Sequence, residues 1–460
     1  MRRLNSLCLK PMALGLLGLF CSQVSTAATV AIIDSGIDYK HEFLQDRMWI
    51  NPVDQAFDNT DTDNNGYVDD VYGWNFFNRS PHVIDYKYND IYNSQIQRFF
   101  ELQTSILLGQ ATEADMEWFQ GVMQDRQFVR DAMTFANFVH GTHVAGISAQ
   151  PGNDVKVMAI RLIPTENPLF NLQQDVELSI REGQEFNWIV KQIIKGGLYL
   201  LAKTQAMVFD EVAAYLDQHK VDVANASLGV SATQMRQILT PLLKLANRGK
   251  EPPVELVDEI LVFFLERLNI EQAVMMRKAP NTLFVFAAGN DGISNDKFPT
   301  APASIQHPHV ISVAATHAGG QIAKFSNFGM RVDIAADGVA IQSSIPNDLY
   351  MALSGTSQAA PLVSGVAGEI KAINPQLGIA EIKKIIMTSV DKRAELAGLV
   401  KAGGLLNPER SLKAAELSLE MPLDQAMDMA RQMITDIDRT RAETPKTEGT
   451  LLPLLPPFLF

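Results

Sequence analysis

The chain has 460 residues, of which 47% are hydrophobic and 20% are charged, and its formal net charge is -13. The apolar fraction is enough for a large buried core and excludes an intrinsically disordered chain. The negative charge argues against nucleic acid and anionic membrane surfaces as partners.

The first residues have the pattern of a secretory signal. Basic residues precede the apolar run 12–20, and Ser25-Thr26-Ala27 offers small residues for cleavage after Ala27. The run is too short for a membrane-spanning helix. Residues 1–27 are therefore predicted to be a signal peptide, and the protein is expected to be exported, as a secreted or periplasmic protein. Both cysteines, Cys8 and Cys21, lie in this segment, so the mature chain could form no disulfide.

Short runs of apolar and β-branched residues recur along the chain and predict strands. They cover residues 29–33, 155–162, 221–228, 283–288, 309–315 and 332–335. Most are separated by stretches of helical periodicity, and near-continuous apolar strands between helices are typical of a parallel sheet buried on both faces. We expect a three-layer α/β fold with a mainly parallel central sheet flanked by helices, and ligands bound beyond the carboxyl ends of the strands.

Three helical insertions are expected within a catalytic domain that spans residues 28–415. They lie near 79–135, 165–220 and 231–280, and the apolar spacing between 94 and 133 predicts two helices. Their stripes favour core packing, and a rim that shapes a substrate cleft is the alternative. Residues 416–444 are predicted to contain a C-terminal helix. The Pro- and Leu-rich residues 445–460 are expected to form a flexible tail, too short and too interrupted by proline to span a bilayer.

The segment 61–70 has the pattern of a calcium-binding loop. Side-chain oxygens stand at its first, third and fifth positions, and Gly66 follows at the sixth, as in the first part of an EF-hand loop. Tyr72 occupies the twelfth position, where a glutamate would close the site, so another carboxylate would have to do this. The predicted ligands of a structural calcium are Asp61, Asp63, Asn65, Asp69 and Asp70. The alternative is a solvated turn that holds no metal.

Three short motifs supply an acid, an imidazole and a hydroxyl, which together can activate a serine as a nucleophile. Asp34 follows the first predicted strand, His140 opens His-Gly-Thr-His, and Ser357 lies in Gly-Thr-Ser at the predicted start of a helix. A serine there has its own N–H and the helix dipole directed at an oxyanion. We predict that Asp34 orients His140, and that His140 is the base for the nucleophile Ser357.

These motifs, in the order Asp, His, Ser, resemble those of the subtilisin-like serine proteases. Residues 29–50, 138–163, 221–230 and 283–374 read like segments of that family. The resemblance implies that Asn290, after Ala-Ala-Gly, donates to the oxyanion. It also implies two walls that bind an extended peptide substrate, formed by Ser227, Leu228 and Gly229 and by Ala287, Ala288 and Gly289.

The sequence departs from the family pattern at Asp337, Gln358 and Leu362, none of which supplies a catalytic atom. His143 follows His140 by three residues, but the family places this position in the helix after the base, which argues against a metal ligand.

The expected function is that of an exported serine endopeptidase that acts on peptides or proteins without a cofactor for the chemistry. No stable membrane insertion is expected. Two alternatives stay open: a processing peptidase of narrow specificity, and a catalytically silent binding protein with the same fold.

Overall fold

The computed structural model describes residues 27–150, 152, 154–166, 188–247 and 249–439. The predicted signal peptide, apart from Ala27, and the predicted tail 445–460 lie outside the described residues. No helix in the described ranges is both long enough and apolar enough to cross a bilayer.

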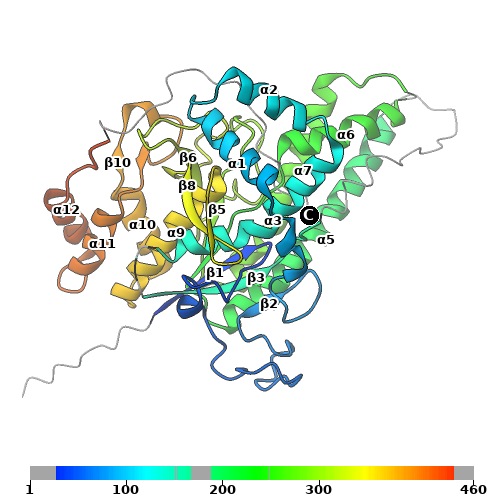
Figure 1. Ribbon diagram of the computed structural model, residues 1–460. Helices are drawn as coiled ribbons and strands as arrows, with labels where there is room; N and C mark the ends of the chain where they lie inside the picture. The colour runs from blue at the N-terminus through cyan, green and yellow to red at the C-terminus, as the bar shows by residue number, and fades with distance from the viewer. Residues whose placement is uncertain (1–26, 151, 153, 167–187, 248, 440–460) are drawn as a thin grey trace, which may run out of the picture.

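A nine-stranded sheet forms the centre of the molecule (Figure 1), in the order β10-β11-β7-β6-β5-β4-β1-β3-β2. Its strands are β1 Ala28–Asp34, β2 Gly73–Asn75, β3 Val155–Arg161, β4 Val223–Ala226, β5 Leu283–Ala287, β6 Val310–Thr316, β7 Ile334–Asp337, β10 Asp391–Lys392 and β11 Gly404–Leu405. All neighbours are parallel except β10 and β11. The hairpin β8 (Ile341–Ile345) and β9 (Leu349–Leu353) forms a separate sheet.

Helices cover both faces of this sheet and extend beyond it. They are α1 Ser94–Leu107, α2 Glu113–Val122, α3 Arg126–Ser148, α5 Trp188–Gln218, α6 Ala232–Ala246, α7 Val254–Gln272, α8 Val274–Lys278, α9 Thr356–Ile373, α10 Ile379–Thr388, α11 Pro408–Leu417 and α12 Leu423–Met433.

The residues of β1 show why the predicted strands are continuously apolar. Val30 and Ile32 belong to the hydrophobic core beneath α3 and α9, whereas Ala31 and Ile33 belong to the core beneath α5 and α8. Because successive side chains of a strand point to opposite faces, burial on both faces requires an apolar residue at every position. The predicted three-layer α/β fold is confirmed.

The insertion before His140 differs from the expected pair of helices. It contains α1, α2 and the first half of α3, which pack together with the β8–β9 hairpin in a hydrophobic cluster of their own. Asp125 caps the start of α3 by accepting hydrogen bonds from the backbone N–H groups of Gln127 and Phe128. The helix then runs without interruption into the segment that carries His140, so the insertion and the His-Gly-Thr-His motif share one rigid element.

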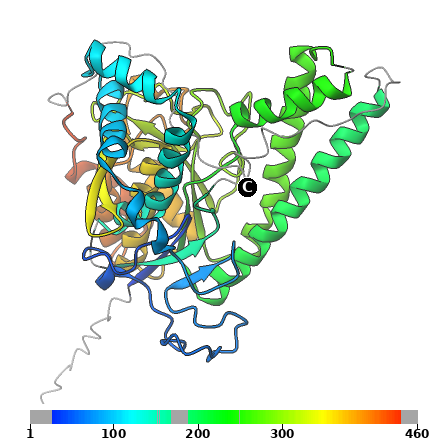
Figure 2. The same cartoon turned by 45° about the vertical axis from the view of Figure 1, so that its right-hand side comes forward.

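A second group of helices, α5, α6 and α7, forms an arm that projects from the body of the molecule (Figure 2). The arm has its own apolar core, which includes Leu239, Ile260 and Phe264. The carboxyl half of α5 continues into the main body, where Phe209 and Tyr215 pack beneath the sheet. We call α5, α6 and α7 the helical arm.

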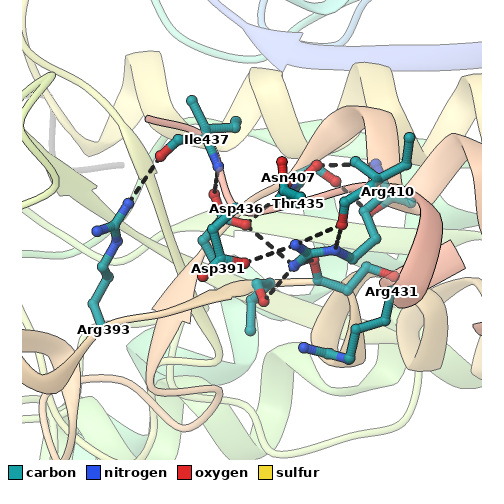
Figure 3. Close-up of polar contacts among 12 residues, drawn as sticks. Asp391, Arg393, Asn407, Arg410, Arg431, Thr435, Asp436 and Ile437 are labelled. Atoms are coloured by element: carbon teal, nitrogen blue, oxygen red, sulfur yellow. Dashed lines mark hydrogen bonds and ion pairs between the residues drawn. The ribbon is translucent and has the colours of Figure 1, made fainter. Parts of the chain in front are cut away.

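After α12 the chain crosses the edge of the sheet as an extended segment, residues 434–439, which we call the C-terminal strap. The buried Arg410 of α11 holds it (Figure 3): Nη2 donates to the Asp436 carboxylate at 2.7 Å and to the Ile434 carbonyl at 3.0 Å, and Nη1 donates to Asp391 of β10 at 3.1 Å. Asp391 also accepts a hydrogen bond from the backbone N–H of Ile437. The predicted C-terminal helix therefore ends at Met433, and polar contacts fasten the residues that follow.

Candidate active site

Asp34 lies at the carboxyl end of β1 and its side chain is fully buried. Its Oδ1 accepts a hydrogen bond from the backbone N–H of Ser35 at 2.7 Å and lies 2.7 Å from Nδ1 of His140. Its Oδ2 has no hydrogen-bond partner among the described residues. The short contact fixes the Nδ1 edge of the imidazole and leaves Nε2 as the nitrogen that can exchange a proton with a substrate or a nucleophile.

The close approach of α3 to the end of β1 depends on Gly141. A Cβ atom at this position would lie 2.2 Å from the carbonyl oxygen of Gly36, and the backbone N–H of Gly141 donates to Ser35 Oγ at 3.2 Å. A glycine directly after His140 thus lets the helix backbone touch the turn that follows Asp34.

The environment of His140 favours its protonated form. Burial alone would lower the pKa of the imidazole, but the charge and the hydrogen bond of Asp34 outweigh burial and raise the pKa above its usual value. About a fifth of the side chain is exposed, 21%. A histidine with a buried carboxylate on one side and an open edge on the other can act as a base that becomes a stabilised cation.

Ser357 occupies the first turn of α9, after the N-cap residue Gly355. Its Oγ donates a hydrogen bond to the backbone carbonyl of Ser227 at 3.2 Å, and within the described residues the hydroxyl makes no other hydrogen bond. The Ser227 hydroxyl in turn donates to the carbonyl of Ser357 at 3.0 Å. The end of β4 and the start of α9 are thereby joined at Ser357, and the hydrogen bond to Ser227 has to break before the Ser357 hydroxyl can donate to another acceptor.

Asn290 lies beside the same turn. Its Oδ1 accepts from both the backbone N–H and the hydroxyl of Thr356, each at 2.9 Å, and its Nδ2 makes no hydrogen bond within the described residues. A Cβ at Gly355 would lie 2.8 Å from Gln358 Oε1, 3.4 Å from that Nδ2 and 3.6 Å from the Ser357 nitrogen, so two N–H donors and one side-chain acceptor border the same small space. Two N–H groups beside one space can stabilise a developing oxyanion.

Both predicted substrate walls contact this turn, one through Ser227 and Ser357 and the other through Gly289 and Thr356. In the first, the Leu228 side chain is buried and the Ser227 hydroxyl donates to the Ser357 carbonyl of α9. The backbone groups of this wall are therefore the ones that could bind a substrate. In the second, Gly289 has a φ of 110°, and a Cβ there would lie 2.5 Å from Asn327 Nδ2. Ala287 and Ala288 are buried before it. Binding of a peptide by both walls stays a prediction.

His143 is fully buried and contacts the backbone of the β8–β9 hairpin. Its Nε2 lies 3.0 Å from the carbonyl oxygen of Met351 in β9, and burial lowers its pKa to about 3. A neutral histidine bound to a backbone carbonyl connects α3 to the β8–β9 hairpin, which is a packing role.

The predicted calcium ligands separate into two sets. Asp61 and Asp63 both accept from the backbone N–H of Asn65, at 3.0 and 3.1 Å, and the Asn65 side-chain amide bridges Asp63 and Asp70. Asp69 turns away and accepts from the backbone N–H groups of Asp58 and Asn59 instead.

Asp70 is the most constrained residue of this loop. It accepts a hydrogen bond from Tyr215 Oη at 2.7 Å and lies 3.3 Å from His219 Nε2. Burial alone would raise its pKa, but hydrogen bonds, chiefly from His219 and Tyr215, bring it below its usual value. Within the described ranges, no three His, Cys, Asp or Glu side chains form a group that could hold a metal ion. Asp61, Asp63 and Asp70 do offer the oxygen donors that calcium prefers, and calcium binding stays a prediction.

Three residues in the hydrogen-bond network around Ser357 escaped the sequence analysis: Thr356, Asn225 and Ser364. Asn225 Nδ2 donates to the Ser227 hydroxyl at 3.0 Å, and its Oδ1 accepts from Ser364 of α9 at 2.9 Å. Both asparagine and serine side chains are fully buried. Thr356 could have been found from its place in Gly-Thr-Ser, but Asn225 and Ser364 carry no local signal because their contacts join distant parts of the chain.

Comparisons with known proteins identify the family of this chain. A family model described as the subtilase family matches residues 25–405. Alkaline elastase YaB of Bacillus sp. (strain YaB) is 34% identical over 146 residues, which are 32% of this chain and 36% of that protein. Subtilisin BL of Lederbergia lenta is 31% identical over 145 residues, which are 32% of this chain and 51% of that protein. The chain thus matches about half or less of the length of these curated relatives.

Among solved structures, a cold-adapted subtilisin-like serine proteinase aligns with 83% of this chain and 88% of its own, at 17% identity and a TM-score of 0.44.

Proposed function

This chain belongs to the subtilase family, and from that premise we propose that it is an exported serine endopeptidase that cleaves peptide bonds in proteins by way of an acyl-enzyme. The observation that carries the proposal is the contact of 2.7 Å between the buried Asp34 and His140, on a helix that packs against the helix of Ser357. Asn290 Nδ2, which has no hydrogen-bond partner in the described part of the chain, supplies the remaining group that the reaction needs.

In the proposed reaction the Ser357 hydroxyl turns from the Ser227 carbonyl toward His140, which removes its proton as the oxygen attacks the scissile carbonyl. Asp34 stabilises the imidazolium that forms. Asn290 Nδ2 and the Ser357 N–H, which lies in the first turn of α9 and has no intrahelical acceptor, bind the oxyanion. His140 then gives the proton to the leaving amine, and water releases the acyl group by the same steps in reverse.

Labelling with a fluorophosphonate probe tests the nucleophile. The folded protein is expected to be labelled, and Ser357→Ala is expected to abolish labelling. Ser304→Ala is a matched control, since Ser304 is also buried and its hydroxyl has no hydrogen-bond partner in the described part of the chain. If the wild-type protein takes no label while its melting curve shows it folded, the silent binding protein is the better reading.

A narrow processing specificity is favoured by the two helical insertions. The α1–α3 group and the helical arm each have a separate hydrophobic core, so each is expected to be rigid and to restrict which substrates can approach the site. Cleavage of a randomised peptide library distinguishes a processing peptidase of narrow specificity from a general degradative peptidase. A few strongly preferred sequences support processing, and many weakly preferred ones support general degradation.

Export is proposed from the residues before β1. The first residue of that strand, Ala28, is buried, and its N–H donates to the carbonyl of Asp154 at 2.8 Å. Cleavage after Ala27 would leave the strand whole. Sequencing of the amino terminus of protein recovered outside the cytoplasm is expected to begin at Ala28, and a terminus that still contains Met1 would contradict export through this signal.

Calcium is proposed as a structural ion of the 61–70 loop. At 100 times its Kd an ion that binds only the folded protein adds about 2.7 kcal/mol, which corresponds to roughly 3 °C in Tm for a chain of this size. Melting with calcium and with a chelator measures the shift. Asp61→Asn and Asp63→Asn are expected to remove it, and the exposed Asp46→Asn is expected to keep it. Equal melting curves with and without calcium would refute the site.

A further inference from the structure

The outer face of α5 carries an exposed apolar stripe that the protein's own core does not use. Its large residues are unusually open to solvent: Ile193 is 68% exposed, Leu200 65% and Met207 70%. The opposite face of the helix is buried against α7 and α8. We define the α5 stripe as Ile193, Gly197, Leu200, Leu201, Thr204, Met207 and Val208.

The spacing of the stripe is that of a helix–helix seam. Positions 193, 197, 200, 204 and 207 alternate in steps of four and three, and large residues alternate with Gly197 and Thr204. This is the heptad pattern that places a row of side chains against a second helix. The stripe extends about 22 Å along the helix axis.

Two adjacent glycines leave room for that second helix. A Cβ added at Gly196 or Gly197 would have no atom within 4 Å, so the space beside the backbone is empty. Glycine inside a helix costs about 1 kcal/mol relative to alanine. Close approach of a partner helix gives a physical reason for two such residues side by side on an exposed face.

From these observations we infer that the α5 stripe is the contact surface of a homodimer, in which α5 of two copies pack antiparallel about a two-fold axis between Leu200 and Leu201. This axis sets Ile193 opposite Val208 of the partner subunit and Gly197 opposite Thr204 of the partner subunit. Large residues meet large residues, and small ones meet small ones. One surface thus complements itself, as a two-fold interface requires.

Charge decides between the two directions of packing. Lys191 and Lys195 at the start of the stripe share one carboxylate, Glu259, which leaves excess positive charge at that end. Parallel helices would place these ends together and would set Lys203 against its own copy, whereas antiparallel helices separate both.

The same charge distribution disfavours a lipid bilayer as the occupant. A helix that lies on a membrane carries a basic polar face opposite its apolar one. Here the opposite face of α5 is buried in its own chain. Of the exposed residues among positions 192–208, Lys203 alone carries a charge, and the formal net charge of the chain is -13.

The area of contact predicts a weak dimer. A specific interface needs about 800 Å² on each partner, and one helix face of two heptads supplies less. The surface continues onto α7, where Arg267 lies over the Tyr199 ring at 5.5 Å and Ile270, one turn further, is also exposed. We therefore expect reversible association in the micromolar range.

Sedimentation of the full chain from low to several hundred micromolar tests the dimer. Wild-type protein is expected to shift from monomer to dimer, and Leu200→Lys is expected to weaken association by about tenfold or more. Leu419→Lys, which changes an exposed leucine outside the arm, is expected to leave it unchanged. Cleavage of a small peptide substrate by Leu200→Lys is expected to equal that of wild type, which separates this test from that of the enzyme.

Cross-linking tests the direction of packing. In a background with Cys8 and Cys21 replaced by serine, a mixture of Gly197→Cys and Thr204→Cys proteins is expected to form disulfide-linked pairs faster than either protein alone. A wild-type protein that stays monomeric at all concentrations would overturn the inference. So would a Leu200→Lys variant that dimerises normally, or binding of the stripe to phosphatidylglycerol vesicles without self-association.

Discussion

Replacing Thr356 by valine tests whether Asn290, the proposed oxyanion donor, depends on Thr356 for its orientation. The Asn290 side chain is oriented by two hydrogen bonds from Thr356, one from the backbone N–H and one from the hydroxyl, both at 2.9 Å. Valine has nearly the same shape, keeps the first bond and removes the second. Thr356 is 1% exposed, so no water is expected to replace the lost hydroxyl.

The size of the effect follows from the bond that remains. A neutral hydrogen bond contributes about 1 kcal/mol, which corresponds to a roughly fivefold change in rate. Loss of an oxyanion donor itself lowers kcat about 10²–10³-fold, the magnitude found in subtilisin. Thr356→Val is therefore expected to lower kcat about fivefold with little change in KM, and Asn290→Ala is expected to lower it far more.

Steady-state kinetics on a chromogenic peptide, with the double variant, measure the coupling. Because Thr356 acts through Asn290, adding Thr356→Val to Asn290→Ala is expected to cause almost no further loss. Thr356→Ser keeps the hydroxyl and is expected to retain nearly full activity. The hydroxyl also accepts from the Gly289 N–H at 3.2 Å, so melting curves must accompany the kinetics. Independent losses in the double variant would refute the positioning role.

Three further predictions concern the acid–base pair, the helix approach and the strap. The proposed reaction requires neutral His140, whose pKa is raised by Asp34, so kcat/KM should rise with pH through that pKa. Asp34→Asn should lower kcat by about 10⁴-fold, and it should move the acidic limb of the pH profile to lower pH because the charge that raises the pKa of His140 is gone. An acidic limb that does not move would contradict this effect of the Asp34 charge. Gly141→Ala places a Cβ 2.2 Å from the Gly36 oxygen and should cost about 1–3 kcal/mol in denaturant unfolding, whereas Gly121→Ala, with no atom within 4 Å, should be neutral or stabilising. Arg410→Met leaves the buried Asp391 without its cation and should lower the free energy of unfolding by about 3–5 kcal/mol. The control is Lys413→Met, which removes a partly exposed lysine and its surface ion pair with Glu416 and should cost under about 1 kcal/mol. Equal losses in the two variants would refute the special role of the buried pair.

Local patterns were sufficient for the parts of the site that each motif contains. The β-branched run before Asp34 predicted a buried strand that ends in a carboxylate, and the small residues around Ser357 predicted a helix start. Both agree with β1 and α9. The contact of Asp34 with His140 agrees with the orienting role predicted from the motifs, and that role stays a prediction.

Long-range contacts were beyond reach of the sequence. Asp70 was predicted as a metal ligand from its loop alone, and nothing nearby indicated that Tyr215 and His219 would contact it. The continuous helix α3 was missed because the Asp125 cap lies inside a segment whose apolar stripe looked like the end of a separate helix. A capping residue can begin a helix where periodicity alone suggests that one ends.

The C-terminal strap has a consequence for the order in which the protein can mature. Arg410 and Asp391 receive further partners from residues 434–437, which follow β10 and α11 in the chain. The ribosome makes these residues after β10 and α11, so the polar contacts around the outer strand are completed only once the strap has been synthesised. A copy cut before residue 434 would keep the buried Arg410–Asp391 pair but lose the Asp436 carboxylate and two backbone partners, and we expect it to unfold more easily than the intact protein.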